Sequence, residues 1–331
     1  MNWTGRRVLV TGAAGFIGSH LAEELVARGA LVRAFVHYNA LGSIGNLRYL
    51  EPAVLDALEI VAGDVRDPYG VRSAVSGAEA VFHLAALIGI PYSYLAPASY
   101  VQTNVIGTLN VLEAARSEEV ERVLVTSTSE TYGTAQYTPI DERHPAVAQS
   151  PYAATKIAAD QLALSYHRSF DLPVGIVRPF NTFGPRQSRR AILPTIVSQA
   201  LNGGGSLRLG SVEPRRDLTY VTDIAAGFVV LAERAEAIGR ATNLGTGASQ
   251  SVGEMVDVVG RVLGERLRVE LEPARVRPER SEVMELCADA SFARSLGWLP
   301  QVGFAEGVAR IVEFMRSRGT EPLRRSERYQ V

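Results

Sequence analysis

The N-terminal stretch of the chain alternates short apolar runs with one amphipathic segment. Val8 to Val10 form an apolar run of strand length, and apolar residues then recur at helical spacing between positions 17 and 26. A second apolar run follows at 31–36. The pattern predicts a strand, a tight turn, a helix and a second strand, as in the opening unit of an α/β sheet.

The same alternation continues to about residue 180 and then changes. Apolar runs at 58–61, 80–84 and 174–177 predict three more strands. The stretches 93–116 and 151–170 predict two long helices. Farther along, Gly, Pro and Arg become frequent and the expected elements are shorter. We therefore expect a large α/β domain followed by a smaller substrate-binding lobe, with the chain crossing back to the first.

The two expected long helices carry more apolar surface than a single sheet would cover. Surplus apolar surface of this kind is typical of a subunit interface. The sequence therefore predicts a homodimer.

The composition narrows the class of protein. The 331 residues are 47% hydrophobic with a formal net charge of −1, which argues against a nucleic-acid-binding or membrane-surface protein. No apolar run approaches the ~20 residues that a membrane span requires. The one cysteine, Cys287, fits a reducing cytoplasm, and the five histidines show no metal-ligand spacing, so we expect a cytoplasmic protein without a metal. The first strand begins so early that no signal peptide is expected.

Three regularly spaced glycines occupy the turn between the first strand and its helix. Gly12, Gly15 and Gly18 would let the backbone turn tightly and approach a pyrophosphate, whose charge sits at the helix N-terminus. The alternative is a glycine-rich turn without a ligand. The strand before it and the helix and strand after it favour a dinucleotide site.

The second strand lacks the acidic residue that usually holds the adenosine ribose of NAD. Val36 occupies that place and His37 follows it. Nothing there rejects a 2′-phosphate by charge, and Arg33 or His37 would tolerate one. NAD is the expected cofactor, with NADP as the alternative.

The ends of the next two strands also suggest cofactor contacts. Asp64 follows the third strand and would accept a hydrogen bond from an adenine amino group; the alternative is a cap or turn residue, a role that Asp67 fits. His83 lies within the fourth strand, so we interpret it as a core histidine with its hydrogen bonds satisfied. The small residues Ala85 and Ala86 would let the backbone lie close to the cofactor.

A tyrosine and a lysine stand four residues apart in the second long helix. Tyr152 and Lys156 would share one helix face and act on the same atom. The charge of Lys156 is expected to lower the pKa of Tyr152, which would make it a base for a sugar hydroxyl near neutral pH. The spacing alone is common, but here it follows the VERVLVTSTS run and the upstream glycine motif.

Taken in order and spacing, the segments TGAAGFIGSHL, GDVRD, HLAA, TSTSETYG, SPYAATK and RPFNTFGPR resemble the extended short-chain dehydrogenase/reductase family that modifies nucleotide sugars. The resemblance runs from Val8 to about Phe314. It implies a Rossmann doubly wound parallel sheet with bound NAD at 1–180, a smaller α/β lobe for the nucleotide sugar mainly at 181–318, a polar tail at 319–331, and a homodimer. Within the family, the chain looks most like legionaminate-type nucleotide-sugar 4,6-dehydratases and UDP-glucuronate decarboxylases.

Residue roles follow from this resemblance position by position. It implies that Tyr152 is the base, that Lys156 supports it and holds the nicotinamide ribose, and that Thr128 hydrogen-bonds the sugar O4. It places Ser129 and Glu130 beside sugar C5 and C6. The implied cofactor contacts are Gly12, Gly15, Phe16, Ile17, Gly18, His37, Asp64, Val65, Leu84, Ala85, Ala86, Asn104, Thr126, Tyr152, Lys156 and Pro179. The implied diphosphate contacts are Asn181 and Arg216, joined by Arg277, with Arg186 and Arg189 as further phosphate candidates and a surface ion pair as the alternative for each arginine.

The residue after Thr128 decides which reaction the resemblance implies. All these relatives first oxidise the sugar at C4. In the dTDP-glucose dehydratases an aspartic acid follows the threonine and protonates the departing C6 hydroxyl, whereas here Ser129 stands in that place and is a poor acid. A 4-keto uronic acid loses carbon dioxide without a protonated leaving group. The sequence therefore favours decarboxylation of UDP-glucuronate, with a UDP-sugar as the preferred substrate.

Three other reactions or roles stay open. The legionaminate-type dehydratases resemble this chain at Ser129 as well, so 4,6-dehydration of a GDP-, dTDP- or UDP-linked hexose is the first alternative. A C4 epimerase would use Tyr152 but leave Glu130 unexplained. A dinucleotide-binding protein without catalysis would have no use for Thr128, Tyr152 and Lys156 together.

Overall fold

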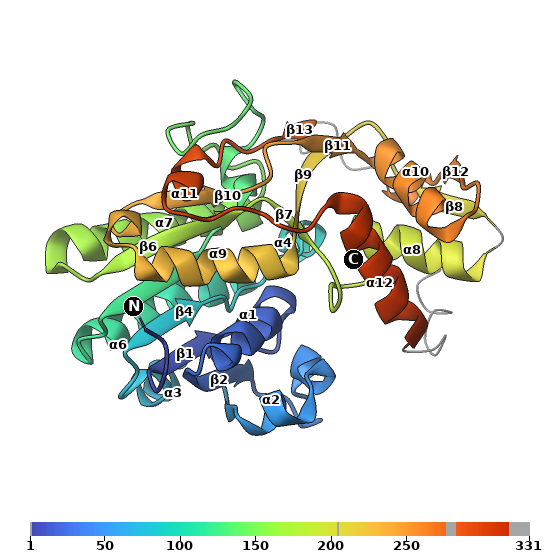
Figure 1. The fold of residues 1–331 in the computed structure, drawn as a ribbon. Helices are drawn as coiled ribbons and strands as arrows, with labels where there is room; N and C mark the ends of the chain where they lie inside the picture. The colour runs from blue at the N-terminus through green and yellow to red at the C-terminus, as the bar shows by residue number, and fades with distance from the viewer. Residues whose placement is uncertain (1, 204, 276–282, 318–331) are drawn as a thin grey trace.

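A parallel sheet of seven strands forms the centre of the molecule (Figure 1). The computed structural model describes residues 2–203, 205–275 and 283–317. The strand order is β10-β6-β5-β4-β1-β2-β3, which is the doubly wound Rossmann arrangement with its reversal between β1 and β4. The strands are β1 (Arg7–Thr11), β2 (Leu31–His37), β3 (Glu59–Gly63), β4 (Ala80–His83), β5 (Arg122–Thr126), β6 (Val174–Pro179) and β10 (Ala241–Leu244).

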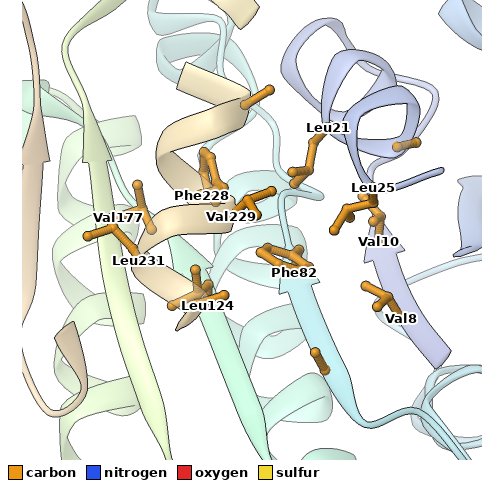
Figure 2. Packing of buried hydrophobic residues seen from close by; sticks show 14 of the residues in the cluster. Val8, Val10, Leu21, Leu25, Phe82, Leu124, Val177, Phe228, Val229 and Leu231 are labelled. Carbon is orange, nitrogen blue, oxygen red and sulfur yellow. The ribbon is translucent and has the colours of Figure 1, made fainter. Parts of the chain in front are cut away.

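Helices cover both faces of this sheet (Figure 1). On one face α1 (Phe16–Ala27) packs against α9 (Val221–Glu233). Figure 2 shows Phe228 and Val229 of α9 close to Leu21 of α1 and Phe82 of β4, within one continuous apolar cluster. The other face carries α3 (Pro68–Val75), α6 (Gly107–Ser117) and α7 (Pro151–Phe170) over a second apolar cluster.

The stretch 93–116, expected as one helix, is divided. Helix α4 (Ile90–Leu95) ends before Pro97, and a new helix, α5 (Pro97–Tyr100), begins at that proline. Proline opens a helix readily because it needs no N–H partner there, but it cannot continue the turn before it. The segment Val101–Ile106 is then π-helical before α6 begins.

The helix expected at 151–170 is confirmed with the same bounds. Ser150 caps it by accepting a hydrogen bond from the backbone N–H of Ala153 at 3.1 Å, and Pro151 occupies the first helical position. The cap and the proline together fix where α7 begins, one residue before Tyr152.

The smaller lobe contains its own strands and helices around a third apolar cluster. Strands β11, β9 and β13 form one sheet, to which β7 adds beside β9, while β8 and β12 form a separate parallel pair. The bounds are β7 (Asn181–Phe183), β8 (Ser206–Leu209), β9 (Arg215–Tyr220), β11 (Ser249–Ser251), β12 (Arg268–Leu271), β13 (Glu285–Leu286), α8 (Ile192–Asn202), α10 (Val252–Leu263) and α12 (Phe304–Ser317). Strand β10 adds to the edge of the large sheet and α9 packs on one of its faces, so the chain returns to the large sheet after β9.

Short elements complete the described chain. They are η1 (Gly45–Tyr49), α2 (Pro52–Asp56), η3 (Ser129–Tyr132), η4 (Ala235–Ala237), η5 (Pro273–Arg275) and α11 (Ser291–Ser295). Within the described ranges, none of the helices combines the length and the apolar character needed to span a membrane.

Candidate active site

The turn from β1 into α1 is packed too tightly against neighbouring backbone to hold side chains at two of its glycines. Gly12 has a φ of +70°, and a Cβ there would lie 2.7 Å from the backbone nitrogen of Ala85. A Cβ on Gly18 would lie 2.2 Å from the carbonyl oxygen of Gly12, so neither position accepts a side chain. Gly15 is the N-cap of α1 with no side-chain cap, and the first turn carries no acidic residue. The free N–H groups of this turn therefore fit the pyrophosphate of a dinucleotide.

Arg33 is committed to structural contacts. Its guanidinium donates to the Glu59 carboxylate at 2.9 Å and to the carbonyl oxygens of Ala74 and Ser76 at 2.7 and 3.0 Å. The expectation that Arg33 would tolerate a 2′-phosphate is therefore wrong in this geometry. His37 ends β2 with an exposed side chain and stays a candidate for the ribose end of the site.

Asp64 lies directly after β3 but is bound to a neighbour. The Arg66 guanidinium donates to both carboxylate oxygens, at 2.9 Å to Oδ1 and 3.0 Å to Oδ2 from Nε. This hydrogen bonding lowers the pKa of Asp64. An adenine amino group would have to share the carboxylate with Arg66. The next residue, Val65, is buried against α6.

The interpretation of His83 as a core histidine is confirmed. The backbone N–H groups of Leu84 and Ala85 donate to Thr11 Oγ1, which lies 2.8 Å from His83 Nδ1. On the other side, His83 Nε2 lies 3.1 Å from the hydroxyl of Thr108. Burial lowers the pKa of His83 to about 3, so the ring is neutral and serves to fix the segment after β4.

Asn104, expected to contact the cofactor, instead holds protein segments together. It is fully buried in the π-helical turn, and its side chain accepts from Leu87 N–H at 2.8 Å. The same amide donates to the Leu87 carbonyl at 2.9 Å and to Thr155 Oγ1 at 3.0 Å. With the amide occupied in this way, we assign Asn104 to fixing residues 84–87, including Ala86, against α7.

Thr128, Tyr152 and Lys156 come together where β5 ends and α7 begins. Thr128 is the N-cap of η3, and its hydroxyl lies beside that of Tyr152 and favours the phenolate. Burial nevertheless raises the pKa of Tyr152, and the negative charge of Glu130 raises it further. The expectation of a Tyr152 pKa lowered by Lys156 is therefore wrong, because desolvation outweighs the hydrogen bond with Thr128 that favours the phenolate.

Lys156 lies one helical turn beyond Tyr152 and is only 3% exposed. Burial lowers the pKa of its ammonium to about 8, and the charge of Asp160 opposes this shift. Among the described residues, no hydrogen bond or ion pair is made by its Nζ. The ammonium is therefore available to a group bound beside it.

The other residues expected at this site lie at the carboxyl ends of the central strands. Ser129 is buried and Glu130 half-buried in η3. Thr126 ends β5, and its Oγ1 is buried without a hydrogen-bond partner in the described structure. An orphaned hydroxyl at this edge of the sheet fits contact with a bound cofactor. Pro179 ends β6, and Phe16 and Ile17 open α1.

Asn181 and Arg216 lie on paired strands of the smaller lobe. The parallel register of β7 and β9 aligns Asn181 with Leu218, two residues beyond Arg216. Arg216 is 8% exposed, and its guanidinium donates to the carbonyl oxygen of Arg215 at 2.9 Å. The structure therefore brings these two residues to adjacent strands, and their contact with a diphosphate stays a prediction.

Two further candidate arginines, Arg186 and Arg189, lie in the loop after β7. Arg186 forms an ion pair with Glu23 of α1 at 2.8 Å, its side chain is 10% exposed, and its φ is +67°. A phosphate would have to replace Glu23 there. Arg189 is exposed and its carbonyl oxygen accepts from Thr195. Arg277 lies outside the described residues.

Two features near Tyr152 were not found from the sequence. The Tyr100 ring packs edge-on against Tyr152 at 6.3 Å, and the charge of Arg190 partly offsets the burial that raises the pKa of Tyr100. Asp160 and Arg178 form a buried ion pair at 2.8 Å near Lys156. Only the helical spacing of Asp160 from Lys156 could have indicated the second feature. In the described part of the chain, no three His, Cys, Asp or Glu residues cluster in a way that could hold a metal.

Comparisons with known proteins agree with this geometry. The family model described as GDP-mannose 4,6 dehydratase matches residues 9–311. UDP-glucose 4-epimerase from Mycolicibacterium smegmatis is 35% identical, covering 94% of this chain and 99% of its own length. The structure of DesIV, a dTDP-glucose 4,6-dehydratase from Streptomyces venezuelae with NAD bound, is similar with a TM-score of 0.82 and 31% identity, covering 94% of this chain and 97% of that one.

A third similarity is to MoeE5 in complex with UDP-glucuronic acid and NAD. Its TM-score is 0.82 at 32% identity, covering 94% of this chain and 99% of that chain. The matches extend over both lobes and include the glycine turn and the Tyr152–Lys156 helix. The chain belongs to the GDP-mannose 4,6 dehydratase family, within the extended short-chain dehydrogenase/reductases that act on nucleotide sugars as dehydratases and epimerases.

Proposed function

We propose that this protein is an NAD-dependent nucleotide-sugar lyase that oxidises the sugar at C4 and then eliminates a small molecule. The observation that carries the proposal is the convergence of Thr128, Tyr152 and Lys156 near the carboxyl end of β5, on the same edge of the sheet as the glycine turn after β1. NAD is preferred over NADP because Arg33 is occupied by Glu59 and two carbonyl groups. Bound there, NAD would accept the hydride from sugar C4 and return it after the elimination.

Tyr152 is the proposed base for the O4 proton. Its pKa is raised because the phenolate would be a buried anion. A protonated Lys156 and an oxidised nicotinamide ring are both cationic, so their presence beside the hydroxyl stabilises the phenolate. Thr128 orients the sugar O4 toward Tyr152. We therefore expect Tyr152 to become an effective base only in the loaded site.

Glu130 is the proposed residue for the elimination step. In a 4-keto hexose, its carboxylate removes the C5 proton, the C5–C6 double bond forms, and the C6 hydroxyl leaves as water with a proton from the same carboxyl. A single carboxyl group that takes and returns the proton makes an acid at Ser129 unnecessary. Because the family model and DesIV are both named as 4,6-dehydratases, we rank 4,6-dehydration first.

Decarboxylation of UDP-glucuronate is the second candidate. It is supported by the poor acidity of Ser129, which is only 3% exposed, and by the likeness to MoeE5, whose structure contains UDP-glucuronic acid. Glu130 does not decide against it, because repulsion between Glu130 and the substrate carboxylate would be relieved when carbon dioxide leaves. The mycobacterial relative is named as a UDP-glucose 4-epimerase, but epimerisation at C4 would leave Glu130 without a role.

The test is mass spectrometry on purified protein incubated with NAD and, separately, GDP-N-acetylglucosamine, dTDP-glucose and UDP-glucuronate. Loss of water from either of the first two supports dehydration. Loss of carbon dioxide from the third alone would replace it with decarboxylation. The absence of any mass change with all three would contradict the lyase proposal. Chromatographic separation of isomers in the same samples would then reveal an epimerase.

A further inference from the structure

A cluster of three charged side chains is buried between α7 and β6. Lys156, Asp160 and Arg178 are 3%, 1% and 7% exposed. Lys156 and Asp160 are four residues apart on α7, so they share one helix face. A buried charge without a counter-charge is costly, so the carboxylate of Asp160 stabilises the two buried cations, Lys156 and Arg178.

Asp160 connects this cluster to the segment after β5 that carries Thr128. Its Oδ2 accepts the Ser127 hydroxyl at 2.8 Å and the Arg178 guanidinium at 2.8 and 3.3 Å. Ser127 directly precedes Thr128, so one carboxylate oxygen ties the end of β5 to β6 and α7. The second oxygen, Oδ1, is buried without a hydrogen-bond partner in the described structure.

Arg178 is held from its other side by neutral groups. Its Nη1 donates to the Tyr132 hydroxyl at 3.1 Å, and that hydroxyl donates to Asn243 Oδ1 at 2.7 Å. The guanidinium also lies over the Tyr132 ring, 5.0 Å from its centre. Arg178 is thereby fixed on Oδ2, which leaves Oδ1 as the free acceptor one helical turn from Lys156.

The other titratable groups around Lys156 do not replace Asp160. On β4, His83 is neutral. Tyr152 on the same helix and Tyr100 on α5 both have raised pKa values and carry no charge near neutral pH. Glu130 on η3 is half-buried and lies beside Tyr152. Among these groups, Asp160 is the buried carboxylate on the same helix face as Lys156.

We propose that Asp160 is a positioning residue that keeps Lys156 in its charged form and fixes the segment after β5 that bears Thr128, with Arg178 holding the carboxylate in place. The inference deepens the proposed function and depends on it only where turnover is concerned. The charge state of Lys156 can be measured without any substrate.

The experiment uses the fact that Lys156 is the only lysine in the sequence. Protein without a lysine-containing tag, grown with isotope-labelled lysine, gives one side-chain NMR signal, whose pH titration reports Lys156 alone. Asp160→Asn removes the charge and keeps an acceptor for Ser127. We expect its titration midpoint to fall by about one pH unit or more below that of the wild type.

The direction of this shift separates the proposal from a merely structural role. Loosened packing would admit water and raise the midpoint toward the ordinary lysine value, whereas loss of a nearby anion lowers it. An unchanged or raised midpoint in Asp160→Asn would overturn the proposal. Asp171→Asn is the matched control, because it removes the same charge from an exposed position at the other end of α7, ~22 Å along the helix. Its midpoint should equal that of the wild type.

A second variant covers the case in which Asp160→Asn does not fold. Asp160→Glu keeps the anion on a longer side chain, so its midpoint should stay within about half a pH unit of the wild type. A fall as large as that expected for Asp160→Asn would contradict the proposal.

If a substrate is found, the alkaline limb of kcat in Asp160→Asn should move by the same amount as the NMR midpoint. The absence of turnover on every sugar would count against the proposed function and leave the NMR result to decide on Asp160.

Discussion

Tyr152 and Lys156 show how burial changes the chemistry that a sequence motif suggests. Helical spacing correctly predicted that the two side chains lie on one face, because that depends only on the local backbone. The predicted direction of the Tyr152 pKa shift was wrong, because desolvation depends on tertiary packing that helical spacing does not reveal. The ion pair of Arg186 with Glu23 of α1 could not be predicted either, because the two residues are far apart in the sequence and meet only in the folded chain.

Turnover should fall as the pH rises through about 8. The pKa of Lys156 is lowered from the ordinary lysine value to about 8, so the ammonium loses its proton in that range and no longer supports the Tyr152 phenolate. The measurement is kcat as a function of pH with saturating sugar and NAD. An alkaline limb only near the ordinary lysine range, at about pH 10.4, would contradict this assignment.

Gly18→Ala should weaken both folding and NAD binding. The added Cβ would lie 2.2 Å from the carbonyl oxygen of Gly12, so the glycine turn has to shift. We expect a loss of about 1–3 kcal/mol in the free energy of unfolding, as for other overpacked sites. Calorimetric NAD titration and denaturant unfolding measure the two effects. Gly303→Ala, where a Cβ meets no atom within 4 Å, is the control and should change NAD affinity little.

Among the elements, α7 was predicted with its correct bounds, whereas the stretch 93–116 was predicted as one helix and is divided in the structure. A serine cap, a proline and continuous periodicity mark α7 from the sequence alone. The broken helix keeps apolar periodicity across Pro97, so the pattern hides the restart and the π-helical turn that follows. π-Helical turns are frequent at functional sites, and this one places Asn104 between the segment after β4 and α7.

Asn104→Ala should therefore affect NAD binding without removing a cofactor contact. It leaves the N–H and carbonyl of the half-buried Leu87 without these partners, which costs about 1–3 kcal/mol in the free energy of unfolding. Because residues 84–87 border the glycine turn, NAD affinity should also fall. Denaturant unfolding and NAD titration test this, with exposed Gln102→Ala from the same turn as the control. Unchanged values for both quantities would contradict the role assigned to Asn104.

For the whole molecule, we propose that the active form is a homodimer. Leu95 and Val101 expose 69% and 45% of their surface on the segment that was expected to form the subunit contact. Leu95→Glu combined with Val101→Glu should convert a dimer into a monomer, measured by light scattering during size exclusion. Leu41→Glu, at a position 92% exposed on another loop, should leave the dimer intact. A wild-type protein that is monomeric at every concentration would refute the dimer.

The central claim is that Tyr152 takes the O4 proton while sugar C4 is oxidised by NAD, and that Glu130 acts afterwards. The most direct measurement is the near-ultraviolet absorbance of NADH in single-turnover mixtures of enzyme, NAD and the sugar found by mass spectrometry. Glu130→Gln should accumulate NADH and release product slowly, because oxidation proceeds and elimination stalls. Tyr152→Phe should show almost no NADH. NADH formation at the wild-type rate in Tyr152→Phe, or unchanged product release in Glu130→Gln, would contradict the account.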